Sequence, residues 1–124
     1  MNAFSTEFEF TLPLGYRDAD GNLHKQGVMR LATAADEILP MKDHRVQANP
    51  AYLPVIVLSR VISRLGNLDM VNTKVIEDLF TPDFSYLQKF YNRINDTDHA
   101  EHDETADSAP GMEATAAPGK LASL

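Results

Sequence analysis

Closely spaced acidic side chains near residue 20 are the first group in this chain that could bind a metal ion. Asp18, Asp20 and Asn22 have the alternate spacing with which a calcium-binding loop begins. Such a loop needs glycine at its sixth position and glutamate at its twelfth, which here are Leu23 and Met29. We therefore interpret the segment as a hairpin turn, in which an Asp-Gly pair is a strong turn signal.

The histidines give a second possibility of metal binding. His99 and His102 lie three residues apart with Glu101 and Asp103 beside them. Two ligands do not form a closed site, so we interpret these histidines as incidental. His24 and His44 are isolated in the sequence, and we expect surface or turn positions for both. The sequence predicts neither a metal nor a cofactor.

Adjacent carboxylates at Asp36 and Glu37 could in principle act as a catalytic pair. Neighbouring side chains on a helix point about 100° apart, however, and Thr33 with Asp36 forms a capping box that explains Asp36 without catalysis. No serine has a nucleophile-elbow context, no glycine loop for phosphate is present, and the absence of cysteine excludes thiolate chemistry. We expect a protein that is not an enzyme.

Partner binding is the remaining chemistry. Arg60 and Arg64 lie four residues apart on an expected helix, where they form either a row facing an acidic partner or a solvated edge that covers apolar neighbours. Tyr86, Phe90 and Tyr91 on the last helix belong either to the core or to an apolar groove for a partner. These five are the candidate partner-binding residues.

The N-terminal part of the expected fold is a β-hairpin over residues 8–31. Apolar and polar residues alternate over 8–12, as in a half-buried strand, and the segment Pro13-Leu14-Gly15 is expected to end that strand. Residues 23–31 return as a second strand. Gly27 within it indicates a bulge or a close backbone approach.

About four helices are expected within residues 33–94. The first is capped by Thr33 and ends near Pro40, before a polar connection over 41–47. The apolar spacing of Val57, Leu58, Val61, Ile62 and Leu65 predicts a core helix that is closed by Gly66. It begins either at Pro50, with Asn49 as its cap, or near Leu53, with Pro54 in its first turn. Asn72 caps a third helix, and Thr81-Pro82 begins a fourth that presents Phe84, Leu87, Phe90, Tyr91 and Ile94 on one face. The fold class is α+β.

Charge separates the chain into a body and a tail. Residues 1–94 hold ten basic and eleven acidic residues, whereas residues 95–124 hold seven acidic residues and one lysine. We expect a frayed start over 1–7, one domain over 8–94 and a disordered acidic tail over 95–124. A near-neutral body with an acidic tail argues against nucleic acid. The longest apolar run is too short for a membrane span and no secretory signal is present, which favours the cytoplasm.

Several segments of the body carry a family resemblance. They are the segment from Phe8 to Tyr16, the segment from Gly27 to Glu37, and the later stretches 45–53, 58–62 and 75–80. Together they resemble the small tail assembly proteins of contractile phage tails and related injection systems, among them tail assembly chaperones and T4-type baseplate hub assembly proteins. The resemblance covers residues 8–94 and includes no catalytic or metal signature.

This resemblance implies a non-enzymatic helper in the cytoplasm of a host bacterium. Such a protein would bind the tape measure or a baseplate hub protein until the tube polymerises. The alternative is a permanent structural component of the baseplate or injection particle, which would place the chain in the virion or particle.

Overall fold

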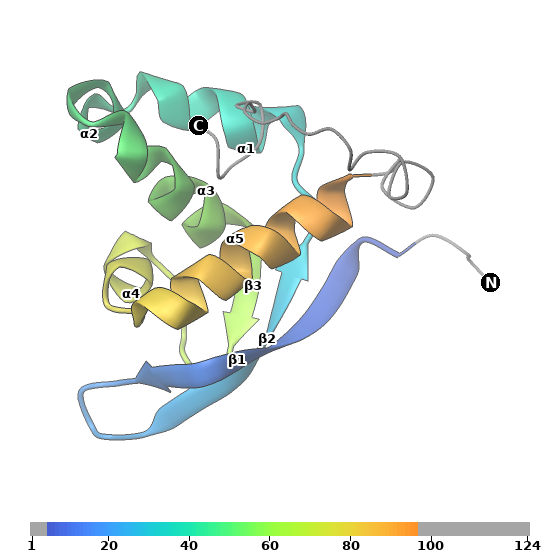
Figure 1. Cartoon of the computed structure of the whole chain (residues 1–124), viewed down its shortest axis with the longest axis vertical. Coiled ribbons are helices and arrows are strands. Elements are labelled where there is room, and N and C mark those ends of the chain that lie inside the picture. The colour runs from blue at the N-terminus through green and yellow to red at the C-terminus, as the bar shows by residue number, and fades with distance from the viewer. Residues whose placement is uncertain (1–4, 97–124) are drawn as a thin grey trace.

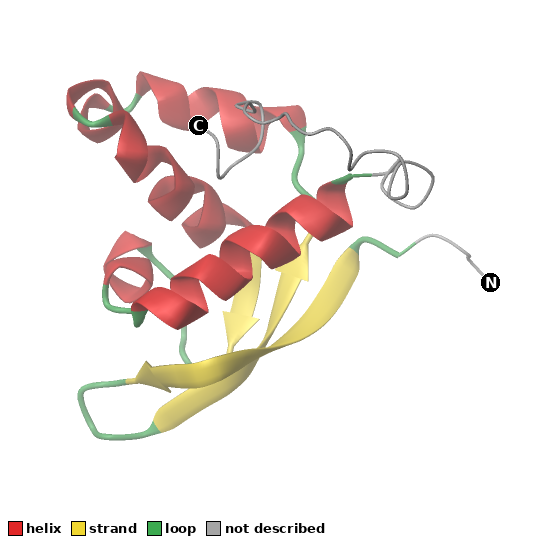
Figure 2. Ribbon diagram, in the orientation of Figure 1, coloured by secondary structure: helices red, strands yellow, loops and turns green. Residues whose placement is uncertain are grey.

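The computed structural model describes residues 5–96 and confirms the α+β class (Figures 1 and 2). Within these residues a three-stranded antiparallel sheet in the order β1-β2-β3 is combined with five α-helices and two short 3-10 helices. The elements in chain order are β1 (Glu7–Arg17), β2 (Leu23–Arg30), α1 (Ala34–Ile38), the 3-10 helix η1 (Leu39–Lys42), α2 (His44–Ala48), the 3-10 helix η2 (Pro50–Tyr52), α3 (Leu53–Val61), β3 (Ile62–Leu65), α4 (Thr73–Glu77) and α5 (Thr81–Asn95).

The first strand of the β1–β2 hairpin is longer than expected, although the hairpin itself covers nearly the predicted residues. Strand β1 does not end at Pro13: it continues to Arg17, and its pairing with β2 is interrupted between Thr11 and Tyr16. Proline has no amide to donate and Gly15 has a positive φ of 104°, so this stretch bulges out of the ladder rather than terminating the strand. The turn of the hairpin lies at the opposite end of the molecule from α1 and α2 (Figure 1).

Gly27 allows the neighbouring strands β1 and β3 to lie close to β2, as the sequence predicts for a glycine at this position. A side chain on this residue would collide with the ring of Phe10 on β1 and with the backbone carbonyl of Arg64 on β3. The central strand can therefore lie close to both neighbours only with glycine here.

The core helix is shorter than its apolar pattern suggests. Helix α3 ends at Val61, and Ile62 to Leu65 form the third strand, which the sequence interpretation missed. Ile62 and Leu65 are both buried, and their spacing of three residues is that of a helix rather than that of an alternating strand, so the local pattern favoured a longer helix. Gly66 has the left-handed conformation expected of it, with φ of 55°, but it follows a strand.

The expected polar connection over 41–47 is wrong, because η1 and α2 make this stretch mostly helical. Asp43 caps α2 by accepting the amide of Arg45. Asn49 caps η2 by accepting the amide of Ala51, in line with the helix entry predicted at Asn49 and Pro50. Both helices are a single turn long, and such short elements give almost no periodic signal in a sequence.

The last two helices match their predicted positions closely. Asn72 caps α4 by accepting the amide of Val75, as expected. The cap residue of α5 is Phe80 rather than Thr81, and Pro82 lies in its first turn, where a missing amide costs nothing.

Helices α3 and α5 supply much of the core, which the sheet completes. Figure 1 shows α5 crossing the sheet, and α3 contacts α4, α5 and β3. Fully or nearly fully buried side chains from these elements include Leu12, Met29, Val57, Leu58, Val61, Leu65, Leu87 and Tyr91. The acidic tail expected over 95–124 lies outside the described residues from position 97 onward.

Candidate functional site

A pocket of about 490 Å³ lies between the sheet and α5, and it is the candidate partner-binding site. We call it the β1–α5 pocket. Its lining residues are Glu9, Phe10, Thr11, Gln26, Gly27, Arg64, Tyr86, Phe90 and Arg93.

Three aromatic rings form the apolar wall of this pocket. The ring centroid of Phe10 lies 6.4 Å from that of Tyr86 and 5.7 Å from that of Phe90, edge to face in both cases. Tyr86 and Phe90 stack with their centroids 5.9 Å apart. Rings at these distances attract one another beyond simple burial, so the wall is preorganised.

Two arginines provide the charge of the pocket. Arg93 lies on α5 with its Cζ 5.1 Å from the centroid of the Phe90 ring, and Arg64 reaches the pocket from β3. Both residues are exposed, and within residues 5–96 neither makes an ion pair with an acidic side chain. The single acidic residue in the lining is Glu9. Guanidinium groups beside aromatic rings suit an extended segment that carries carboxylates.

Asp83 and Tyr86 hold α5 against the free edge of β1. The carboxylate of Asp83 is fully buried and accepts the amides of Leu14 at 2.8 Å and Gly15 at 2.9 Å. The hydroxyl of Tyr86 accepts the amide of Thr11 at 3.4 Å. These bonds satisfy edge and bulge amides that would otherwise lack a partner, and they fix the position of the aromatic wall.

The structure brings together three of the five predicted partner-binding residues. Arg64, Tyr86 and Phe90 line the β1–α5 pocket, whereas Arg60 and Tyr91 do not. Because α3 ends at Val61, Arg60 and Arg64 do not form a row on one helix. The sequence interpretation missed Arg93, although its position three residues after Phe90 places it on the same face of a helix.

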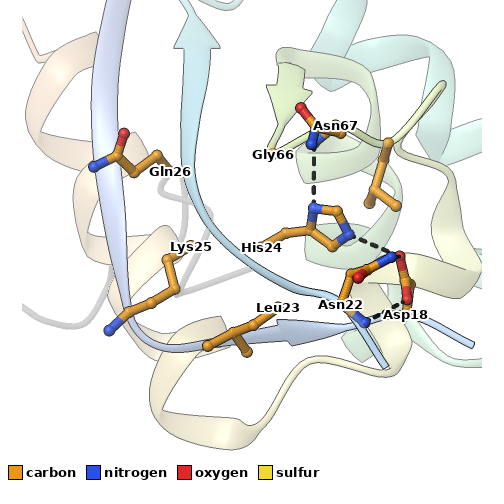
Figure 3. A pocket seen from close by; sticks show the side chains of 9 residues that line it. Asp18, Asn22, Leu23, His24, Lys25, Gln26, Gly66 and Asn67 are labelled. Atoms are coloured by element: carbon orange, nitrogen blue, oxygen red, sulfur yellow. Dashed lines mark hydrogen bonds and ion pairs between the residues drawn. The ribbon is translucent and has the colours of Figure 1, made fainter. Parts of the chain in front are cut away.

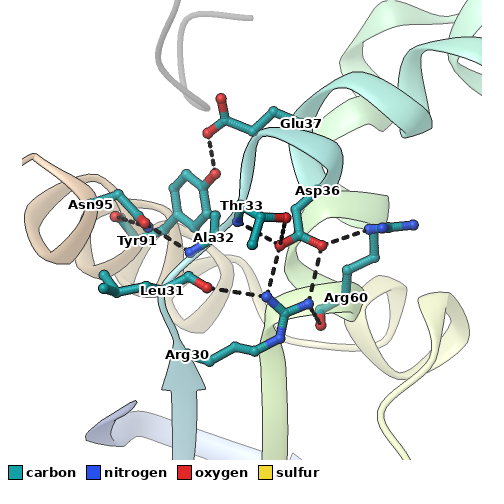
Figure 4. A network of polar contacts seen from close by, with 9 residues as sticks. All are labelled: Arg30, Leu31, Ala32, Thr33, Asp36, Glu37, Arg60, Tyr91 and Asn95. Atoms are coloured by element: carbon teal, nitrogen blue, oxygen red, sulfur yellow. Dashed lines mark hydrogen bonds and ion pairs between the residues drawn. The ribbon is translucent and has the colours of Figure 1, made fainter. Parts of the chain in front are cut away.

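Arg60 belongs to a polar network centred on the buried carboxylate of Asp36 (Figure 4). Arg30 binds this carboxylate through both terminal nitrogens, at 2.7 and 3.0 Å, and the Nε of Arg60 binds it at 3.0 Å. The amide of Thr33 donates to it at 2.8 Å, which confirms the predicted capping role of Asp36. The network joins β2, α1 and α3.

This environment strongly favours the ionised form of Asp36. The hydrogen-bonded guanidinium of Arg30 holds the pKa of the carboxyl well below its usual range, and Thr33 and Arg60 act in the same direction against the opposing effect of burial. A carboxylate so held is a poor general base, because it gives up its charge only at low pH. The network therefore has a structural role.

Tyr91 is a core residue rather than a surface one. Its side chain is 2% exposed, and its hydroxyl donates to the carboxylate of Glu37 (Figure 4). Burial, followed by this hydrogen bond, raises the pKa of Tyr91 far above its usual value. Asn95 completes the contact by accepting the amide of Ala32 at 2.9 Å, so the end of α5 is fixed to the connection after β2.

A second pocket, of about 600 Å³, surrounds His24 next to the hairpin turn (Figure 3). His24 is buried within β2, contrary to the expected surface or turn position, whereas His44 is exposed. The Nδ1 of His24 accepts the amide of Asn67 at 3.2 Å, so the proton lies on Nε2, which is 2.9 Å from the carboxylate of Asp18. Since both ring nitrogens are occupied, this pair resembles a catalytic dyad in composition only.

Asp18 organises the hairpin turn, as the sequence predicts for this segment. Its carboxylate accepts the amides of Asp20 and Asn22, both at 2.9 Å, in addition to the bond with His24. The bond with His24, followed by these amides, lowers the pKa of Asp18 to about 2. The Asp18 carboxylate, the first of the groups that could have bound calcium, is thus engaged in the turn.

Two further observations apply to the described residues. Residues 5–96 contain no group of three or more His, Asp or Glu side chains that could hold a metal ion. No helix in this part of the chain has the length and apolar character needed to cross a membrane.

Comparison with known proteins returned no match: no family model fits the chain, and no curated protein or solved structure is significantly similar to it.

Proposed function

We propose that the chain is a non-enzymatic assembly protein of a contractile phage tail or related injection system, and that it binds the tape measure or a baseplate hub protein through the β1–α5 pocket. The family resemblance over residues 8–94 suggests the system. The observation that supports binding is the pocket itself, in which a stacked aromatic wall lies beside two arginines without acidic partners among residues 5–96.

The composition of the pocket suits a peptide better than a small substrate. The pocket is an elongated site between β1 and α5, and most of its lining residues are polar or charged. Phe10 and Phe90 are buried behind the half-buried ring of Tyr86. Aromatic residues and arginine are also the residue types that contribute most to protein–protein binding. An extended or helical segment of a partner can therefore bind here.

The first experiment is co-purification of the full chain with the tape-measure and hub proteins encoded in the same genome. Binding by one of these proteins should be lost in the variants Tyr86→Ala and Arg64→Glu. It should persist in Lys89→Gln, because Lys89 is exposed on α5 but does not line the pocket. A genome that encodes no tail proteins, or binding that is unaffected by the pocket variants, would contradict the proposal.

Mass spectrometry of purified particles distinguishes the two possible roles. A chaperone is released before the particle is complete, so its peptides should be absent. A constant copy number in every particle would instead identify a permanent structural component.

A further inference from the structure

The arginines of the β1–α5 pocket have no acidic partner among residues 5–96, although all the other described arginines except Arg17 have one. Arg30 and Arg60 bind Asp36, and Arg45 binds Asp43. Arg17 instead donates to a backbone carbonyl in the hairpin turn. We propose that the acidic segment after α5, residues 97–124, binds back into the β1–α5 pocket, where its carboxylates pair with Arg64 and Arg93.

Charge complementarity is the first argument. Residues 97–124 hold six acidic residues and one lysine. Five of the six acidic residues fall between positions 98 and 107, next to the end of α5, and the lysine is at position 120. The pocket holds two guanidinium groups against the single carboxylate of Glu9. The acidic cluster and the basic pocket therefore attract one another.

The length of the connection is the second argument. The pocket residues of α5 lie at positions 86, 90 and 93, and the helix ends at Asn95. At about 1.5 Å per residue, the helix covers about 14 Å from Tyr86 to its end. Eight extended residues, 97–104, span up to about 26 Å. The acidic cluster can therefore turn back and follow the whole pocket.

The strength of this contact follows from its intramolecular nature. Pairs between exposed arginines and carboxylates are weak, and such a segment added as a free peptide would bind only at millimolar concentration. A short tether gives an effective concentration in the same millimolar range, so that roughly half of the molecules have the pocket occupied. Occupancy should fall as salt screens the charges.

Such occupancy makes the acidic segment a competitor for whatever else binds in the pocket. With half of the pockets occupied, the apparent Kd of a partner rises about twofold, because only the open fraction can bind. Occupancy of the pocket by residues 97–124 does not depend on the proposed function, since it can be measured on the isolated chain. If the proposed function were wrong, the binding of residues 97–124 in the pocket could still be correct, and the reverse also holds.

Paramagnetic relaxation enhancement in the full chain tests this proposal. The chain has no cysteine, so a single nitroxide can be placed in the acidic cluster through Ala106→Cys. At low salt, the amide signals of Gln26, Arg64 and Phe90 should lose at least half of the intensity that they have in the spectrum of the same chain with the label reduced. The signal of Val46 in α2 should be unaffected, and a few hundred millimolar salt should restore the pocket signals.

Charge variants provide the matched controls. Combining Arg64→Gln with Arg93→Gln should abolish the effect, whereas Lys89→Gln, which removes one charge from α5 outside the pocket, should retain it. Unchanged pocket signals, or equal broadening at Val46, would overturn the proposal. A mixture of isotope-labelled chain without cysteine and spin-labelled chain without isotope should give no broadening, and broadening there would show binding between copies instead.

Discussion

Replacing Asp36 with asparagine should destabilise the fold more than any other change of a single charged side chain in the polar network. The substitution keeps the size of the side chain but removes its charge, and it places an amide group among donors. It would lose the charge-assisted bonds from Arg30 at 2.7 and 3.0 Å and from Arg60 at 3.0 Å. One acceptor oxygen remains for the amide of Thr33.

The size of the expected loss of stability depends on how exposed the two arginine partners of Asp36 are. Removing one member of a fully buried ion pair costs about 3–5 kcal/mol, because the other charge is left without compensation. Here the Arg30 and Arg60 side chains are 34% and 36% exposed, so water can reach their guanidinium groups after the substitution. We therefore expect a loss of about 2–4 kcal/mol in the free energy of unfolding, somewhat below the fully buried case.

Urea denaturation at pH 7 measures this loss, and Asp78→Asn is the matched control. Asp78 pairs with Lys74 at 3.3 Å on the surface of α4, where such a pair contributes about 0.3–0.5 kcal/mol. Equal effects of the two substitutions, or a loss below about 1 kcal/mol for Asp36→Asn, would refute the argument from burial.

The pH dependence provides a second check on the same variant. The folded state lowers the pKa of Asp36, so the carboxylate stabilises the fold fully above its unfolded pKa of about 3.9. That contribution is lost as the pH falls below this value towards the folded-state pKa. The difference between wild type and Asp36→Asn should therefore shrink below about pH 4. A constant difference down to pH 2 would show that charge is not its cause.

Three other predictions, one of them with a control variant, concern the remaining parts of the chain. Asp83→Asn should cost about 1–3 kcal/mol in urea denaturation and speed hydrogen exchange at Leu14 and Gly15, since one buried acceptor is lost; unchanged exchange would contradict this role. Gly66→Ala should cost about 2–4 kcal/mol, because φ is 55° and the new carbon meets the His24 ring. Gly21→Ala, with open space around a φ of 89°, should cost only about 1 kcal/mol, so equal losses would exclude the His24 collision. Deleting residues 97–124 should shift the Tm by less than about 3 °C, and a larger drop would show that they pack firmly on the domain.

The sequence predicted those elements whose signals are local. The caps of α1 and α4 and the turn at Asp18 were predicted correctly, because each depends on side-chain bonds to amides two to four residues away. The short helices η1 and α2 were missed because they are scarcely longer than one period of an amphipathic pattern, whereas the cap of η2 at Asn49, before Pro50, was predicted.

Strand β3 was missed for a different reason. Its four residues follow α3 without a break, and their buried positions at Ile62 and Leu65 continue the apolar spacing of the helix. The switch from helix to strand is decided by pairing with β2, in which Gly27 lies opposite Leu65. Such a long-range pairing has no counterpart in the local sequence.

The β1–α5 pocket depends on that same switch. If α3 had continued to Leu65, Arg64 would lie one turn after Arg60 on a helix, and β2 would lack its second neighbour. Because the chain changes to a strand at Ile62, Arg64 instead lies opposite Val28 in the sheet and reaches the pocket that Phe90 and Arg93 line from α5. The aromatic half of the site was visible in the spacing of α5, whereas its basic half required the sheet to be known.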